Sequence, residues 1–308
     1  MQKKLRANLM LLVAALIWGS TFVAQTTASD TVEPFTFLFS RSFIGFLFLI
    51  PVIAVFNFQN NKKLAEGERK KTLKPSRLTV IAGVLCGIAL VVASYCQQKG
   101  ITLMTENASG KAGFITALYI VFTPIFGVLL KRRIPKIIAV CVPIATVGFY
   151  LLCIKSGFVI EFGDILTLMS AVFFTFHILI IDYFMEKGAN PIKTSCIQFL
   201  VVGIISLFLA FFIETPDLSI IWNSRLEIMY AGFLSSGIAY TLQIMAQKDA
   251  DPTSATLIMS LESVFAVLSG WLILNEALSA KELIGCVFVF VAVILAQVQF
   301  PTPKKKKV

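Results

Sequence analysis

The sequence predicts an all-α integral membrane protein in which ten transmembrane helices form two inverted five-helix repeats. Hydrophobic residues make up 57% of the 308-residue chain and charged residues only 14%, whereas a soluble domain has about 25% charged residues. Ten apolar stretches each approach the roughly 20 residues that span a bilayer. The first five stretches resemble the last five, and an odd number of crossings turns the second set upside down relative to the first.

In the first half, the predicted spans are 8–28, 36–57, 78–98, 109–131 and 135–155. The first span follows a positive start but is longer than the core of a cleavable signal and lacks a clear A-x-A site. The connection 58–77 is polar and too short for a domain. Pro124 lies midway along the fourth span, where it removes a helical hydrogen bond and predicts a hinge.

In the second half, the predicted spans are 163–184, 193–213, 227–247, 253–274 and 280–300. Segment PFTFLFSRSFIG (34–45) follows the first span as PIKTSCIQFLVV (191–202) follows the sixth. This match aligns Pro34 with Pro191 and Arg41 with Gln198. The third and eighth spans also begin alike, with RLTVIAG and RLEIMYAG. We therefore expect one repeat at 1–157 and a second at 158–308, which ends in a basic tail.

The net charge of +10 reflects membrane topology rather than a nucleic-acid partner. Most of the basic residues fall on one side of the membrane if the N-terminus is inside, so the positive-inside rule predicts cytoplasmic N- and C-termini. We expect a multi-pass protein of the inner (plasma) membrane, with the tail Pro303–Val308 contacting anionic lipid. All six cysteines lie in apolar spans, which argues against a disulfide framework or a metal site.

Glu262 lies about nine residues into the ninth span, near the membrane midplane. A carboxylate at this depth normally faces a bundle interior or an aqueous cavity. One interpretation is a site for proton coupling or for a substrate cation. The other is a protonated or hydrogen-bonded structural carboxyl that ties helices together.

Polar and aromatic side chains recur at helical spacing on four other spans, so those of one span share a face. They are Trp18, Thr21 and Gln25 on the first span, Ser94 and Gln98 on the third, Thr116, Tyr119 and Thr123 on the fourth, and Ser236, Tyr240 and Gln243 on the eighth. Amides in hydrocarbon need partners, so these side chains either bond across helices or line a wet cavity. An aromatic and amide lining suits a partly apolar organic molecule better than a metal ion.

Three further polar residues lie within spans. His177 is the only histidine; it is either a cavity residue that relays protons or a hydrogen-bonded core residue. Arg41 and Lys111 lie a few residues inside the predicted outer ends of their spans. Each either extends to the membrane interface or serves as a gate or an anion contact.

Sequence motifs of enzymes are absent: there is no H-E-x-x-H, P-loop, G-x-G-x-x-G or G-x-S-x-G. We therefore expect no enzyme activity, no catalytic residue and no cofactor. Because no ATP-binding module accompanies the spans, any uphill transport would use an ion gradient or exchange.

The segments LIWGSTFVAQ (16–25), SGKAGFITALYIVFTPIFG (109–127) and SLESVFAVLSGWLILNEALSAKELIG (260–285) resemble EamA-type members of the drug/metabolite transporter superfamily. The resemblance implies a central cavity formed by spans 1, 3, 4, 6, 8 and 9. The family's motif positions correspond to Trp18, Gly19, Arg41, Pro124, Glu262 and Glu276. Ser263 stands where the second-repeat motif usually has proline, which casts doubt on a proline kink in the ninth span.

The resemblance also implies a secondary transporter that exports or exchanges a small organic metabolite, such as an amino acid, a purine or a drug-like compound, by alternating access. Its partners would be that substrate, the lipid bilayer and, as a candidate coupling ion, the proton; we expect a monomer. The main alternative is a membrane receptor or scaffold that transports nothing. The short loops argue against it.

Overall fold

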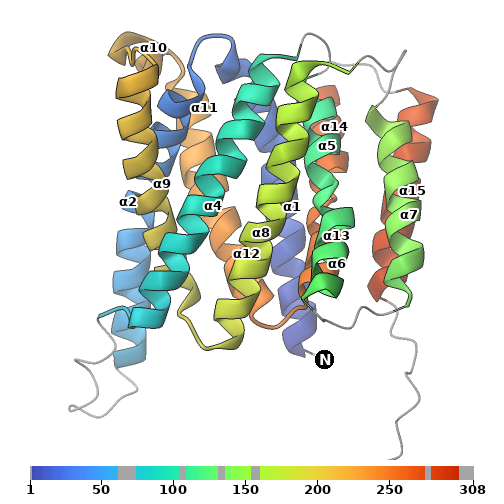
Figure 1. The fold of residues 1–308 in the computed structure, drawn as a ribbon, viewed down its shortest axis with the longest axis horizontal. Coiled ribbons are helices and arrows are strands. Elements are labelled where there is room, and N and C mark those ends of the chain that lie inside the picture. Colours follow the sequence, from blue (N-terminus) through green and yellow to red (C-terminus); the bar gives the residue numbers. More distant parts are fainter. Residues whose placement is uncertain are drawn as a thin grey trace, which may run out of the picture.

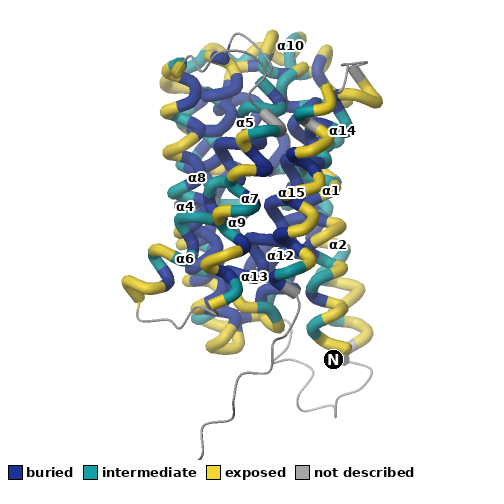
Figure 2. The backbone as a smooth tube through the Cα atoms, turned by 90° about the vertical axis from the view of Figure 1, so that its right-hand side faces the viewer, coloured by how far each residue is buried: buried dark blue, intermediate teal, exposed yellow. Residues whose placement is uncertain are grey.

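The computed structural model describes residues 2–61, 74–104, 108–130, 136–153, 160–274 and 279–297. Every regular element in these ranges is a helix, and the helices form an elongated bundle with buried residues inside and exposed apolar residues outside (Figures 1 and 2). The N-terminus lies at one end of the bundle (Figure 1).

In the first half, each predicted span coincides with helical structure. The helices are α1 (Gln2–Ser29), α2 (Pro34–Asn61), α4 (Arg77–Thr102), α5 (Ala108–Ala117), α6 (Tyr119–Leu129) and α7 (Ile138–Cys153). The start of α4 is set by Ser76, whose hydroxyl accepts a hydrogen bond from the Thr79 amide at 3.2 Å, as expected of an N-cap serine.

In the second half, the helices are α8 (Phe162–Glu186), α9 (Pro191–Ile213), α10 (Leu218–Asn223), α11 (Arg225–Tyr230), the π-helix η1 (Ala231–Ala239), α12 (Tyr240–Gln247), α13 (Pro252–Met259), α14 (Glu262–Leu274) and α15 (Ala280–Gln297). Asn190 and Asp251 cap α9 and α13, each with proline at the first helical position. The short helix α10 precedes the eighth span and has no counterpart among the predicted elements.

The fold class predicted from the sequence is confirmed as an all-α membrane protein. Within the described residues, eight helical segments are long and apolar enough to cross a membrane, and α7 and α15 contain shorter apolar helices at 138–151 and 283–296. These two pack against each other at one side of the bundle (Figure 1). The other helices interleave the two halves: α4 packs on α8 and α9, α2 on α9 and η1, and α1 on η1, α12 and α14.

The same glycine contact joins the two halves at two places. A Cβ atom added to Gly87 of α4 would lie 2.7 Å from the Cβ of Val201 in α9, and one added to Gly232 of η1 would lie 2.6 Å from the Cβ of Ile44 in α2. Ile44 and Val201 are equally far from the prolines that begin α2 and α9. Glycine permits these close crossings of α4 with α9 and of η1 with α2 because it has no side chain.

Both the fourth and the ninth span are interrupted near their middle. Leu118 separates α5 from α6, and its amide bonds to Ile115 O, one residue short of the α-helical partner. Ser260 and Leu261 separate α13 from α14, and the Leu261 amide likewise bonds to the carbonyl three residues earlier, Ile258 O. The sequence suggested that the two halves would bend differently because only the fourth span has proline. Instead both are broken, and the break at Leu118 precedes Pro124, whose role as a hinge stays a prediction.

Candidate functional site: a buried cavity between the two halves

A cavity lies in the interior of the bundle, and the space it leaves for water-sized molecules is about 40 Å³, well below the 300–1,000 Å³ typical of small-molecule sites. Both halves of the chain contribute to its wall. The lining residues are Trp18, Thr21, Phe22, Gln25, Arg41, Gln97, Thr116, Tyr119, Phe174, His177, Ile178, Ser235, Tyr240, Gln243, Met259 and Glu262.

The cavity brings together ten of the side chains singled out from the sequence: Trp18, Thr21, Gln25, Arg41, Thr116, Tyr119, His177, Tyr240, Gln243 and Glu262. Four others are buried but do not line it: Ser94, Gln98, Thr123 and Ser236. Gln98 instead joins helices, because its Nε2 donates to Gln25 O at 3.2 Å. Pro124 is half-buried and also lies outside the lining.

Glu262 is the first residue of α14, and it lines this cavity. The residue is 4% exposed, and its Oε1 has no hydrogen-bond partner within the described residues. The carboxyl interacts electrostatically with the hydroxyl of Tyr119, which is the first residue of α6. The two broken spans therefore meet at the cavity, each with a polar side chain at the start of its second helix.

Arg41 supplies a guanidinium to the same cavity. It is also 4% exposed, so it does not extend to the membrane interface. Its Nη1 donates to Gln25 Oε1 at 3.3 Å, and its guanidinium carbon lies 5.8 Å from the centre of the Phe37 ring. In the described part of the chain no ion pair joins Arg41 to Glu262; the Tyr240 side chain interacts electrostatically with both.

Aromatic rings surround these two charged groups. Trp18 meets Tyr240 edge to face with ring centres 4.8 Å apart, and His177 does so at 5.9 Å. The His177 ring is also positioned by Gln198, because its Nε2 lies 3.1 Å from Gln198 Oε1. Its Nδ1, the indole Nε1 of Trp18 and the Tyr119 hydroxyl have no hydrogen-bond partner among the described residues. The cavity thus combines a carboxyl, a guanidinium, aromatic faces and polar atoms that have no hydrogen-bond partner among the described residues.

The sequence analysis missed six lining residues: Phe22, Gln97, Phe174, Ile178, Ser235 and Met259. The choice of Ser236 over Ser235 has a physical cause. The eighth span is π-helical over 231–239, so side chains about five residues apart share a face there, rather than those three or four apart. Ser235 and Tyr240 are five residues apart and both line the cavity. Gln97 was overlooked beside Gln98; its Nε2 donates to Thr116 Oγ1 at 3.1 Å.

Other predicted features fall outside the cavity. Glu276, the basic tail and most of 58–77 lie outside the described residues. In the ranges that are described, no group of three or more His, Cys, Asp or Glu side chains is placed to hold a metal ion. Metal chemistry therefore has no candidate site in these parts of the chain.

The fold and the cavity define a multi-pass membrane protein with a cavity lined by residues of both its halves. The sequence model of the "EamA-like transporter family" matches residues 5–154 and 161–297. The chain belongs to this family, as the resemblance of its motifs indicated, and it is a membrane transporter.

Relatives and a solved structure agree with this membership. An "uncharacterized transporter" from Archaeoglobus fulgidus is 32% identical over 298 residues, which cover 96% of this chain and 87% of the relative. The "uncharacterized transporter YoaV" of Bacillus subtilis is 20% identical over 97% of this chain and 99% of its own. A crystal structure titled only "Crystal structure of protein" superposes with a TM-score of 0.73 over 94% of this chain and 96% of that chain. At 18% identity, it shows the fold alone.

Proposed function

We propose that this protein is a secondary active transporter that exports or exchanges a small organic metabolite by alternating access. The observation that carries the proposal is the cavity itself, which lies between the two halves and holds a buried carboxylate and a buried guanidinium that do not pair with each other. Burying ionisable groups that form no ion pair with each other is unfavourable, so a ligand that contacts both would account for their presence in one cavity. The moving units would be the repeats 1–157 and 158–308.

The cavity favours amino acids among the candidate substrates. A substrate with an ammonium and a carboxylate would meet Glu262 and Arg41 with complementary charge, and its side chain would contact Trp18 and Tyr240. A purine or a drug-like cation would leave the guanidinium of Arg41 without an anion. Amino acids with large apolar side chains are therefore the first compounds to test.

Glu262 is the proposed coupling residue. A carboxyl enclosed among apolar side chains exchanges a proton or a substrate ammonium only when the cavity opens. In this mechanism the Tyr119 hydroxyl positions the carboxyl. The N- and C-termini would face the cytoplasm, as the distribution of basic residues indicates, and one chain would suffice because it contains both repeats.

The test is transport by the full chain in proteoliposomes, with a panel of radiolabelled amino acids, purines and cationic drugs, each with and without a pH gradient. We expect accumulation of one class to follow the gradient in the wild type and to be lost in Glu262→Gln. Glu33→Gln is the matched control, because Glu33 is an exposed carboxylate before α2. Gradient-driven transport that persists in Glu262→Gln removes Glu262 from coupling. Absence of flux for every compound favours the receptor or scaffold.

A further inference from the structure

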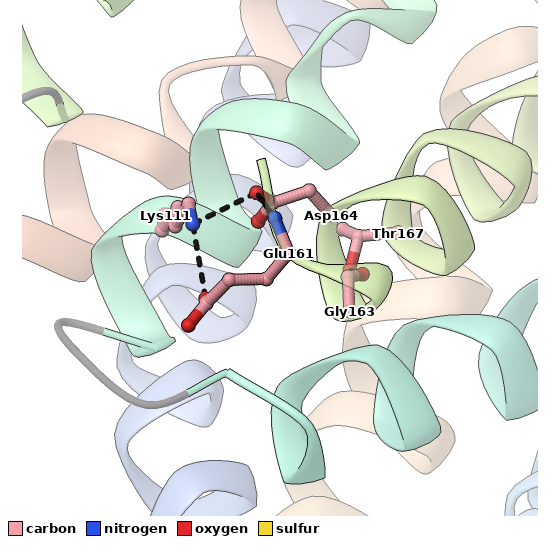
Figure 3. Close-up of polar contacts among 5 residues, drawn as sticks. All are labelled: Lys111, Glu161, Gly163, Asp164 and Thr167. Carbon is pink, nitrogen blue, oxygen red and sulfur yellow. Dashed lines mark hydrogen bonds and ion pairs between the residues drawn. The ribbon is translucent and has the colours of Figure 1, made fainter. Parts of the chain in front are cut away.

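Lys111 joins the two halves of the chain at the end of the bundle opposite the N-terminus. Its ammonium, on the first turn of α5, lies 3.1 Å from Glu161 Oε2 and 2.8 Å from Asp164 Oδ2 at the start of α8 (Figure 3). The side chains of Lys111 and Glu161 are partly accessible, with 19% and 20% of their surface exposed, whereas that of Asp164 is buried, with 8% exposed. A cation of the first half is thus held by two anions of the second.

The two carboxylates are held in place by α8 itself. Asp164 Oδ2 accepts a hydrogen bond from the Glu161 amide at 2.9 Å, and the Glu161 side chain accepts one from the third residue of the helix, so the pair forms a capping box. Negative charge at a helix N-terminus is also favoured by the helix dipole. The anionic site for Lys111 therefore persists when Lys111 leaves it.

A second contact brings the two halves together at the same end. Gly100, near the end of α4, meets Gly163 and Thr167 of α8. A Cβ added to Gly100 would lie 2.3 Å from Thr167 Oγ1 and 2.8 Å from Gly163 O. The Thr167 hydroxyl is itself fixed, since it donates to Gly163 O at 2.9 Å (Figure 3). Any side chain at position 100 would separate α4 from α8.

Both contacts lie between the cavity and the end of the bundle. Thr116 and Tyr119, which line the cavity, follow Lys111 along the same span by five and eight residues. At 1.5 Å per residue, Lys111 is about 8–12 Å closer to the end of the bundle than these side chains. A substrate that enters or leaves the cavity at this end must pass the junction of α5 and α8.

We infer that Lys111, Glu161 and Asp164 form a latch that keeps the cavity closed at this end and opens during each transport cycle. The inference rests on the proposed alternating-access function. A partly exposed ion pair is suited to this role, because its groups regain water when they separate and its net stability is small. The capping box then leaves the carboxylates ready to bind Lys111 again when the cavity closes.

The test measures access to the cavity rather than transport. A reporter cysteine replaces Ser235, which lines the cavity, in a full-length chain whose native cysteines are changed to serine or alanine. A membrane-impermeant maleimide is then added from either face of oriented membranes. We expect Lys111→Gln and Asp164→Asn to raise the labelling rate from the latch face by about two- to five-fold, the shift set by losing an ion pair of this kind. Gly100→Ala should act in the same direction through steric contact alone.

The matched control is Lys187→Gln, because Lys187 lies just past the opposite end of α8 and its ammonium contacts the side chain of Tyr183, on the same helix. Its labelling should equal that of the parent. Labelling at the parental rate in both charge variants overturns the latch, as does a rise confined to the opposite face or an equal rise in the control. The labelling assay needs no substrate, so the latch and the proposed transport are tested separately. Transport by a protein whose charge variants label at the parental rate would contradict the latch alone. Altered labelling in a protein that transports none of the tested compounds would contradict the transport function alone.

Discussion

Replacing Gly19 by alanine should destabilise the protein at the helix crossing beside Glu262. A Cβ at this position of α1 would lie 2.4 Å from Phe265 Cβ, 2.6 Å from Glu262 O and 2.8 Å from Ala266 N. Two of these atoms are backbone, so no side-chain rotation relieves the contact and α1 must move away from α14. Gly127 of α6 is the matched control, since nothing lies within 4 Å of an added Cβ there.

The expected magnitudes follow from opposing terms. Overpacking destabilises by about 1–3 kcal/mol, and the upper part of this range, about 2–3 kcal/mol, applies where the backbone itself must move; alanine returns up to about 1 kcal/mol through its higher helix propensity. Gly19→Ala should therefore lose about 1–2 kcal/mol. Gly127→Ala has only the favourable term and should gain about 0.5–1 kcal/mol. At roughly 2–4 °C for each kcal/mol, the two variants should differ in Tm by about 3–12 °C.

The assay is thermal denaturation of both variants and the wild type in one detergent at one heating rate, followed by size-exclusion chromatography with fluorescence detection. A common heating rate matters because membrane proteins often unfold irreversibly. The reasoning is refuted if Gly19→Ala is as stable as the wild type, or if the two glycine variants shift Tm in the same direction by the same amount.

Three further variants test other contacts. Glu214→Gln should destabilise by about 1–2 kcal/mol in the same thermal assay, because the carboxylate at the end of α9 accepts three hydrogen bonds from Phe35 and Thr36 at the start of α2; an unchanged Tm would contradict this. Ser263→Ala should lose about 0.5–1.5 kcal/mol, since its hydroxyl donates to Gly113 O at 2.8 Å, and no loss would show that the bond is not formed. Arg41→Gln should weaken transport of anionic and zwitterionic compounds by at least tenfold while flux of cations persists; equal losses for all compounds would argue against a carboxylate contact.

Hydropathy was sufficient to locate the spans because the bilayer imposes one length and one composition on all of them. It could not locate α10, whose six residues are too few for a span and too short to show a clear period. Nor could it locate the breaks at Leu118 and Leu261, because the residues there are ordinary helix formers and Pro124 draws attention to a different turn. At both breaks the backbone amide bonds to the carbonyl three residues earlier in the same span, a local change that hydropathy does not register.

Helical spacing predicted the cavity-lining residues of α1 that are polar or carry an indole, but it did not indicate apolar lining residues such as Phe22. Trp18, Thr21 and Gln25 were correctly placed on one face because α1 is continuous over 2–29. On the eighth span, Ser236 was predicted to line the cavity in place of Ser235, because a single sequence does not reveal a π-helix. The position of Arg41 along its span indicated how far it lies from the end of the span. It did not indicate whether the side chain points to the membrane interface or to the cavity.

The two repeats build one site by placing different chemistry at matching positions. Arg41 and Gln198 are each the eighth residue of a helix that begins with proline, and each contacts the preceding span of its own half, Arg41 through Gln25 and Gln198 through His177. The scaffold at this level is thus shared, but only the first copy carries a charge. In the interrupted fourth and ninth spans it is the second copy that carries the ionisable group, which is the carboxyl of Glu262. Each half therefore contributes one ionisable side chain to the cavity, Arg41 from the first and Glu262 from the second.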